Sequence, residues 1–517
     1  MWFAFFMGDE ITSESFSRKD RTGYRERLQE NLEAFDRYLQ EAEFAGEGTI
    51  GLEMEINLAD RAFPHAPALR NIALLEELGE EFQAEIGAYN IELNHPVLHV
   101  TGRGLEELEQ GLTRRLHAAR DTARGQGIEL VTAGILPTLE AGFFSHPEWM
   151  SPARRYEALN SSVLEARGED VRIRIQGEES VDFYAESVAP ESACTSVQLH
   201  LQVAPGDFAS TWNAAQALAG PQLALAANSP LFAGRRLWHE TRIPVFTQAI
   251  DTRPPELVHQ GVRPRVWFGE RWITSVFDLF EENVRYFPAL LPESKEDAGA
   301  DERAESGAPT IHELLLHNGT IWRWNRPIYV PGEDRPHLRV ENRLLPAGPT
   351  VVDTAANAAF YYGLVRYLAS EARPLWSRMS FSTARENFFE CAKHGLDAQV
   401  FWPRAGTVPV SELLVKVLIP QAAEGLAAIG VDADLIDRYI GIVRERALTG
   451  MNGSRWLLDS LDRLDGGLRL DRAAGGAEPG DDPVPVPEPR REALATITGT
   501  YLERQWGNEP VHTWPLA

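Results

Sequence analysis

The chain has 517 residues, 44% of them hydrophobic, and a formal net charge of −26 at pH 7. This length allows one large domain or two to three ordinary ones, with enough apolar residues for a sizeable core. The negative charge argues against a general nucleic-acid binder and against a protein of anionic membrane surfaces, because both partners require a positive footprint.

Apolar periodicity predicts the elements in chain order, beginning with an amphipathic helix over residues 25–44. Strands and helices then alternate, and after Pro349 the chain becomes mainly helical. The predicted strands cover 49–58, 89–100, 128–137, 195–203, 320–330 and 336–346, and the further helices cover 104–127, 351–369 and 410–430. Strands with polar faces dominate the first part and helices the last, which indicates an α+β fold.

The N-terminal residues and the two cysteines indicate the cellular compartment. The apolar run from Trp2 to Met7 is too short for a signal core or a membrane span, and we expect translation to start at Met7. No later segment reaches the length of a membrane helix. Cys194 and Cys391 are far apart and show no metal-ligand spacing, so the absence of a disulfide framework favours a reducing cytoplasm.

Several predicted strands that are otherwise apolar contain carboxylates, which are costly to bury. In "TIGLEMEINL", Glu53 and Glu55 stand at i and i+2 and therefore share one strand face. Glu92 in "NIELN", His200 in "VQLHLQV" and Glu341 in "VENR" lie in other predicted strands. Each alone is explained by a solvated face or a hydrogen-bonded histidine. Together they predict a metal site, for which hard oxygen ligands favour Mg²⁺ or Mn²⁺.

Arginines accompany these acids. Between Ile311 and Leu345 five arginines stand beside four acids, against the charge of the whole chain, and Arg242 follows the turn "NSPLFAG". Arginines on strands hold phosphate or carboxylate bidentately, although any one of them is as readily a surface charge. The candidates for anion binding are Arg242 and Arg343, with Arg323 and Arg339 as weaker ones. Carboxylates for a metal beside arginines for phosphate suit ATP-dependent phosphoryl transfer, and no Walker-type glycine loop is present.

Five of these segments, in order, resemble one known family. "GLEMEIN" resembles the G-x-E-x-E strand of the second glutamate–cysteine ligase family, the carboxylate–amine ligases of the glutamine-synthetase superfamily. "NIELN", "TSVQLHLQV", "NSPLFAG" with Arg242, and "HLRVENRLLPAGPTVVDTAANAAFYYG" resemble its later elements, over about Gly48 to Ser370. This chain departs from the family at Gln198, where many members have the first histidine of H-V-H, which leaves His200 alone.

The resemblance implies an antiparallel sheet curved into a funnel and backed by helices, in which metal-bound ATP and substrate meet. It also implies the reaction: ATP phosphorylates the side-chain carboxylate of glutamate, and an amine attacks the acyl phosphate to form an amide. The metal ligands would be Glu53, Glu55, Glu92, His200 and Glu341; Arg343 and Arg242 would act in catalysis, with Arg323, Arg339 and Arg242 holding the nucleotide.

The expected organisation is an N-terminal extension and helix (1–46), a catalytic ligase domain (47–372) with a mobile loop at 293–309, and a helical C-terminal region (373–517) with a flexible segment at 473–489. The expected partners are an amino acid and an amine, and we expect neither nucleic acid nor membrane to bind. Formation of a homo-oligomer is possible. Two other functions also remain open: a metal-dependent amide hydrolase, and a non-catalytic metabolite-binding relative, the latter motivated by Gln198.

Overall fold

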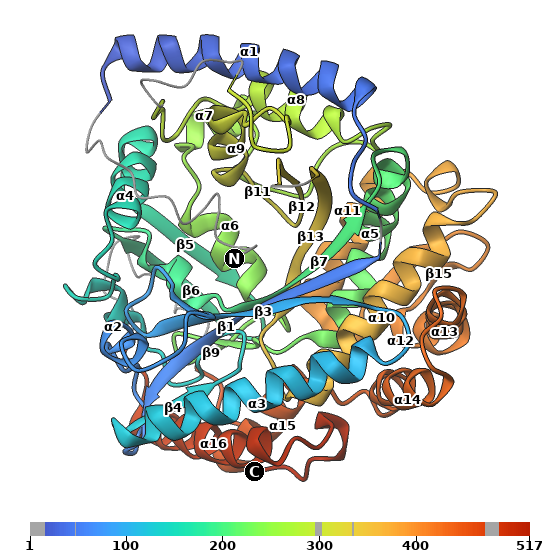
Figure 1. The fold of residues 1–517 in the computed structure, drawn as a ribbon. Coiled ribbons are helices and arrows are strands. Elements are labelled where there is room, and N and C mark those ends of the chain that lie inside the picture. Colours follow the sequence, from blue (N-terminus) through green and yellow to red (C-terminus); the bar gives the residue numbers. More distant parts are fainter. Residues whose placement is uncertain (1–15, 47, 295–301, 333–334, 471–484) are drawn as a thin grey trace.

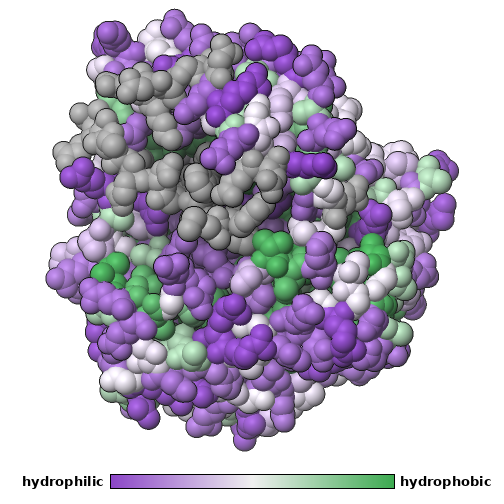
Figure 2. All heavy atoms as spheres, in the orientation of Figure 1, coloured by the Kyte–Doolittle hydropathy of each residue, from purple (hydrophilic) through white to green (hydrophobic). Residues whose placement is uncertain are grey.

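The computed structural model describes residues 16–46, 48–294, 302–332, 335–470 and 485–517. The predicted start at Met7 and the central parts of both predicted loops lie outside these residues. None of the helices in the described ranges has the length and apolar character needed to span a bilayer. On the face shown in Figure 2, hydrophilic residues predominate and hydrophobic ones form small separated groups.

A seven-stranded antiparallel sheet forms the centre of the molecule (Figure 1). Its strands run in the order β12-β13-β7-β1-β3-β2, and β4 also pairs with β1. Their bounds are β1 (Thr49–Asp60), β2 (Phe82–Ala84), β3 (Asn90–His99), β4 (Ile128–Val131), β7 (Ser196–Val203), β12 (Asn325–Val330) and β13 (His337–Pro346). The predicted α+β fold with a curved antiparallel sheet backed by helices is confirmed.

Two predicted strands are shorter than expected. The segment 128–137 is a strand only as far as Val131, because the next amide, that of Thr132, donates to the side chain of Gln505 instead of to a strand. The segment 320–330 divides into β11 (Trp322–Arg323) and β12. β11 pairs with β10 (Val266–Trp267) and not with the central sheet.

The register of the sheet collects the polar side chains. Glu55 lies opposite Glu92 on β3, and Glu53 lies opposite Gln198 on β7. On the other side of β7, His200 lies opposite Glu341 of β13. Directly opposed residues have their Cβ atoms about 5 Å apart, so this register places acids from three strands beside one another.

The opposite face of the sheet is apolar and packs on helices. Leu52, Met54 and Ile56 alternate with the acids of β1 and are at most 1% exposed. They belong to the same hydrophobic core as α3 (Gly104–Gly125), α5 (Pro205–Ala226) and α10 (Val351–Ala369). The Tyr362 hydroxyl of α10 donates to the carbonyl oxygens of Gly51 and His200, which fixes α10 beneath β1 and β7.

The remaining elements surround this core. The helices are α1 (Arg18–Glu41), α2 (Asn71–Leu75), α4 (Arg154–Arg167), α6 (Arg242–Ala249), α7 (Pro255–His259), α8 (Phe277–Tyr286), α9 (His312–Gly319), α11 (Phe381–His394), α12 (Val410–Leu413), α13 (Ile419–Ala428), α14 (Ala433–Thr449), α15 (Gly453–Leu464) and α16 (Glu488–Gly507). The two-stranded pairs are β5 (Val171–Gln176) with β6 (Ser180–Ala185), β8 (Leu231–Phe232) with β9 (Arg235–Arg236), and β14 (Gln399–Trp402) with β15 (Gly406–Pro409).

The last helix is bound to the sheet by polar contacts. Gln505 of α16 accepts from the Thr132 amide and donates to the Leu130 carbonyl, both at 2.9 Å. The Tyr501 hydroxyl donates to the Thr132 carbonyl at 2.8 Å. These contacts satisfy main-chain groups at the end of β4 that no strand satisfies, so the C-terminal region completes the sheet.

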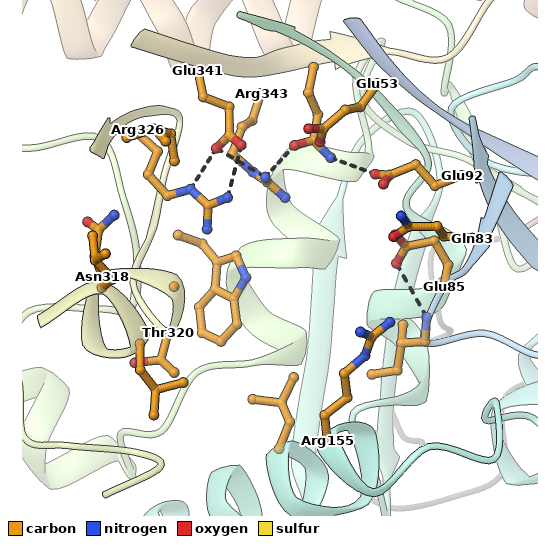
Figure 3. Close-up of a pocket in the computed structure, with 18 of the residues that line it drawn as sticks. Glu53, Gln83, Glu85, Glu92, Arg155, Asn318, Thr320, Arg326, Glu341 and Arg343 are labelled. Carbon is orange, nitrogen blue, oxygen red and sulfur yellow. Dashed lines mark hydrogen bonds and ion pairs between the residues drawn. The ribbon is translucent and has the colours of Figure 1, made fainter. Parts of the chain in front are cut away.

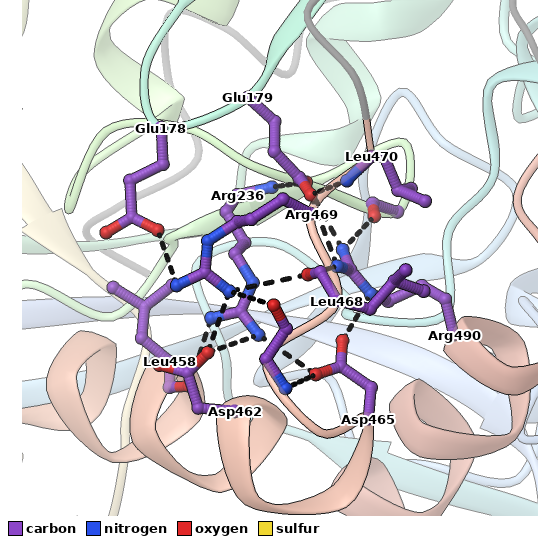
Figure 4. A network of polar contacts seen from close by, with 12 residues as sticks. Glu178, Glu179, Arg236, Leu458, Asp462, Asp465, Leu468, Arg469, Leu470 and Arg490 are labelled. Carbon is purple, nitrogen blue, oxygen red and sulfur yellow. Dashed lines mark hydrogen bonds and ion pairs between the residues drawn. The ribbon is translucent and has the colours of Figure 1, made fainter.

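A buried ionic network fastens the C-terminal helices to the β5–β6 hairpin (Figure 4). Glu179, in the hairpin turn, accepts from the Arg236 amide at 2.7 Å and from the Arg490 guanidinium at 3.2 Å. Arg490 also donates to Asp465 at 2.7 Å. The side chains of Glu179, Arg490 and Asp465 are fully buried, so each charge depends on its partners.

Candidate active site

The polar face of the sheet forms one wall of a cavity of about 210 Å³ (Figure 3). Glu53, Glu55 and Glu92 line it from β1 and β3, and other polar side chains reach it from β7, β12 and β13. Other parts of the lining come from α4, from the end of α9, from Trp322, from the segment 83–86 and from Glu191. Carboxylates from separate strands therefore face one cavity, as strand alternation predicts.

One potential cation site consists of Glu53, His200 and Glu341, whose ligand atoms lie within 4.8 Å of one another. His200 Nε2 is 3.0 Å from a Glu53 oxygen and 3.9 Å from a Glu341 oxygen. Three strands, β1, β7 and β13, each supply one member, so the site exists only in the folded sheet.

A second group consists of Glu55, Glu85 and Glu92, again within 4.8 Å of one another. The Ser196 amide and hydroxyl donate to Glu55 at 2.6 and 3.0 Å. Burial, together with the charge of Glu55, raises the pKa of Glu85 to about 8. Burial and the neighbouring carboxylates also raise the pKa of Glu92 well above its ordinary value. Without a cation Glu85 and Glu92 favour their protonated forms, because burial and like charges at this spacing disfavour ionisation.

Arginines set the charge of Glu341. Arg326 donates to it through two nitrogens at 2.6 and 2.9 Å, and Arg343 donates at 3.2 Å. Burial alone would raise the pKa of Glu341, but the two guanidinium groups outweigh it and hold the pKa well below its ordinary value. Glu341 is therefore an anion, whereas the pKa values of Glu85 and Glu92 are raised.

Gln198 connects the two acidic groups. Its amide nitrogen donates to Glu55 at 3.0 Å and to Glu92 at 3.3 Å, and its oxygen accepts from Arg343. Both ends of the amide are therefore used. The residue by which this chain departs from the family pattern thus contacts three ionisable side chains of the cavity and helps to orient them.

Most of the predicted site residues lie together. Arg339 and Arg343 line the cavity with the five predicted metal ligands, whereas Arg242 and Arg323 are not part of its lining. Arg242 pairs with Glu240 at 3.2 Å and donates to the Leu344 carbonyl of β13 at 2.6 Å. Arg323 pairs with Glu282 at 3.1 Å. The roles assigned to these residues stay predictions.

Comparison with known proteins places the chain in a family, because the model of glutamate–cysteine ligase family 2 matches residues 49–481. The chain belongs to this family. It is a member of a ligase family, and the match extends well beyond Ser370, where the recognisable motifs end. No curated protein matches the sequence.

Two solved structures of ligases are similar to this member of the family. A glutamate–cysteine ligase of Francisella tularensis in complex with AMP is 11% identical, with a TM-score of 0.49, and the match covers 92% of this chain and 97% of that one. A bifunctional glutathione synthetase of Pasteurella multocida is also 11% identical, with a TM-score of 0.43. That match covers 94% of this chain and 55% of the other.

Several residues that line the cavity lie where the sequence pattern indicates no function. Arg326 was one of five clustered arginines, but only the register shows that it lies opposite Glu341. Glu85 follows the short strand β2, and Glu191 and Arg155 lie in a 3₁₀ turn and in a helix. Strand alternation carries no information about such positions.

The donors present suit a hard divalent cation. Each group offers three ligands, five of the six being carboxylates, which is the donor set that Mg²⁺ and Mn²⁺ prefer. The raised pKa values of Glu85 and Glu92 point the same way, because a bound cation would supply the positive charge that these buried acids need. Glu53, His200 and Glu341 would hold one ion, and the other three acids a second.

Proposed function

We propose that this family member is an ATP-dependent carboxylate–amine ligase that forms a γ-glutamyl amide, with glutamate as the acid and cysteine as the first amine to test. The supporting observation is the meeting, in one cavity, of two three-ligand acidic groups with Arg326, Arg339 and Arg343. Membership in glutamate–cysteine ligase family 2 supports the same reaction class.

The reaction has two steps. The side-chain carboxylate of glutamate attacks the γ-phosphorus of ATP, and ADP leaves with the bridging oxygen. The amine then attacks the acyl carbon, phosphate leaves, and the nitrogen loses a proton. Little covalent help is needed, so catalysis consists of positioning and of offsetting charge on the transferring group.

The residues divide this work. Arg343 and Arg339 would face the phosphoryl oxygens, and Arg326 fixes Glu341 so that its carboxylate keeps one orientation. Bound divalent cations would offset phosphate charge. Neither cysteine lines the cavity, and burial raises the pKa of the Cys194 thiol well above its ordinary value, which does not suit a covalent nucleophile.

The direct test is ADP release with Mg²⁺, ATP, L-glutamate and a panel of amines. We expect ADP equal to the amide formed, and a hydroxamate when hydroxylamine replaces the amine, because hydroxylamine traps acyl phosphates. Amide cleavage without nucleotide would instead favour the hydrolase. A protein that releases no ADP with any acid and amine would contradict the proposal.

A further inference from the structure

Two charged residues line the cavity without belonging to either acidic group. Arg155 lies in the first turn of α4, and Glu191 lies in the 3₁₀ turn Ala189–Ala193, labelled η2. Figure 3 shows Arg155 at the bottom of the view and Glu341 at the top, with Glu85 on the right, above Arg155. The cavity therefore carries charged side chains from α4 and η2 in addition to those of the sheet.

Arg155 is held in place by its own neighbours. Its guanidinium lies 4.7 Å from the centre of the Tyr156 ring and donates to the Tyr156 hydroxyl at 2.8 Å. The same nitrogen is 3.4 Å from the Ala84 carbonyl, to which Tyr156 also donates. A long side chain ordered in this way loses little entropy when it binds a ligand. Its planar fork matches the geometry of a carboxylate.

Glu191 presents a carboxylate oxygen that the fold does not satisfy. Its Oε2 atom is buried and has no hydrogen-bond partner among the described residues. The turn that carries it is fixed, because the Ser192 hydroxyl donates to the Ala189 carbonyl at 2.7 Å. An acceptor buried without a donor is costly, so a ligand that brings a charged N–H group would be favoured there.

The two residues belong to one region of the cavity. The Val188 amide donates to the Asn160 side chain of α4 at 3.0 Å, which ties η2 to α4. Glu85 lies within electrostatic range of both Arg155 and Glu191. Burial, together with the charges of Glu85 and Glu55, raises the pKa of Glu191 to about 8, so its carboxyl group lacks a positive partner. An arginine and an acid without a positive partner thus lie in a cavity that also holds the arginines proposed for phosphate.

We infer that Arg155 binds the α-carboxylate and Glu191 the α-ammonium of the amino acid whose side-chain carboxylate is activated. The inference rests on the proposed function and names the residues that select an α-amino acid over a plain diacid. The ammonium held by Glu191 belongs to the activated acid and not to the attacking amine, because a carboxylate keeps its partner protonated and a protonated nitrogen is no nucleophile. Glutamate is thereby kept from attacking its own acyl phosphate.

The test compares L-glutamate with two analogues, glutarate, which lacks the ammonium, and 4-aminobutyrate, which lacks the α-carboxylate. Hydroxylamine serves as the amine, and ADP release gives kcat/KM. We expect the wild type to prefer glutamate over either analogue by on the order of 100-fold or more. Glu191→Gln should remove the preference over glutarate, and Arg155→Gln the preference over 4-aminobutyrate. Both variants should process the respective analogue as the wild type does.

Two exposed neighbours provide matched controls. Glu186→Gln and Arg154→Gln change charges outside the cavity lining and should leave all three kcat/KM values within about 3-fold. Glu191→Gln would overturn the inference if it slowed glutamate and glutarate equally, or if it raised the Mg²⁺ requirement instead. Arg155→Gln would do so if its preference for glutamate over 4-aminobutyrate were unchanged.

A binding measurement separates this inference from the proposed reaction. L-glutamate should raise the melting temperature of the wild type more than glutarate does, and Glu191→Gln or Glu191→Asp should abolish the difference. Absence of ADP release with this difference intact would refute the reaction but not the recognition. Normal ADP release with no difference between the two acids would refute the recognition alone.

Discussion

Arg326 and Glu341 lie opposite each other on β12 and β13 and share two hydrogen bonds in a buried site, with exposed fractions of 6% and 2%. This pair divides the acids of the cavity into two kinds. Arginines lower the pKa of Glu341 and keep it ionised, whereas burial and neighbouring acids raise the pKa of Glu85 and Glu92 and favour their protonated forms. The same face of the sheet therefore carries one acid that is ionised without a metal, and others whose ionisation a bound cation would favour.

Replacing Arg326 should destabilise the folded protein. Arg326→Gln removes one of the two arginines that pair with Glu341, and we expect the free energy of unfolding to fall by about 3 kcal/mol in urea titrations at pH 7. Because the folded pKa of Glu341 lies below its ordinary 4.5, its pairing stabilises the protein above that pH and is lost on acidification. The variant should lose less stability between pH 5 and 3. Arg172→Gln, which breaks a pair on the more exposed β5–β6 hairpin, should cost less than about 1 kcal/mol.

The contribution of Glu85 to stability should depend on pH in the opposite sense to that of Glu341, and cation binding should strengthen as pH rises. The pKa of Glu85 is raised to about 8, so the cation-free protein favours the protonated acid and should lose stability as pH rises from 4.5 to 8. Mg²⁺ or Mn²⁺ should therefore raise the melting temperature more at pH 8 than at pH 6, where protons compete. Glu85→Gln should flatten this dependence. Equal stabilisation at both pH values in the wild type would contradict the assignment.

The two acids of β1 should be needed for the cations. Glu53→Gln and Glu55→Gln each remove one charged ligand, and we expect the half-saturating Mn²⁺ concentration to rise by about 10-fold or more, as measured by calorimetry. Asp60→Asn, at the end of the same strand and paired with Arg70, is the matched control and should leave it unchanged. Unaltered Mn²⁺ affinity in both glutamate variants would exclude them as ligands.

Arg343 distinguishes catalysis from support of the sheet. Lysine retains the charge but cannot contact Glu341 and Gln198 with a planar fork. If the guanidinium positions the phosphoryl group, Arg343→Lys should lower kcat by about 100-fold with little change in melting temperature. If it only joins strands, stability should fall and turnover should stay near normal. A folded, fully active variant would exclude a catalytic role.

Adjacent arginines of α16 offer a sharp comparison of buried and exposed pairs. Arg490 is fully buried against Glu179 and Asp465, whereas Arg491 pairs with Glu140 at the surface. We expect Arg490→Gln to lower the free energy of unfolding by about 3–5 kcal/mol and Arg491→Gln by about 0.5 kcal/mol. Equal costs in urea denaturation would show that the network in Figure 4 contributes no more than a surface pair.

Strand alternation was sufficient to predict which acids share a face. Glu53, Glu55 and Glu341 point into the cavity because the period of a strand is two, whatever the neighbouring strand is. The neighbours themselves depend on register, which alternation does not fix. Arg339 stands two residues before Glu341 on β13 and so shares its face, yet Arg326 on the neighbouring strand makes two hydrogen bonds to Glu341, since opposed Cβ atoms lie about 5 Å apart.

Residues outside the strands were beyond such reasoning. Arg242 begins a helix and Arg323 belongs to a two-residue strand, so no periodicity told which way their side chains point. Both arginines pair with buried acids and neither lines the cavity. Glu191 and Arg155 are placed by the tertiary packing of η2 and α4, which a local pattern does not encode.

The contact between Gln505 and β4 also has a consequence for biosynthesis. The main-chain groups of Leu130 and Thr132 are made hundreds of residues before the helix that satisfies them. In a nascent chain on the ribosome, these main-chain groups at the end of β4 therefore lack their partners until α16 emerges. Exposed edges of this kind pair with other chains, so slow translation or premature termination before α16 should leave a species that needs a chaperone.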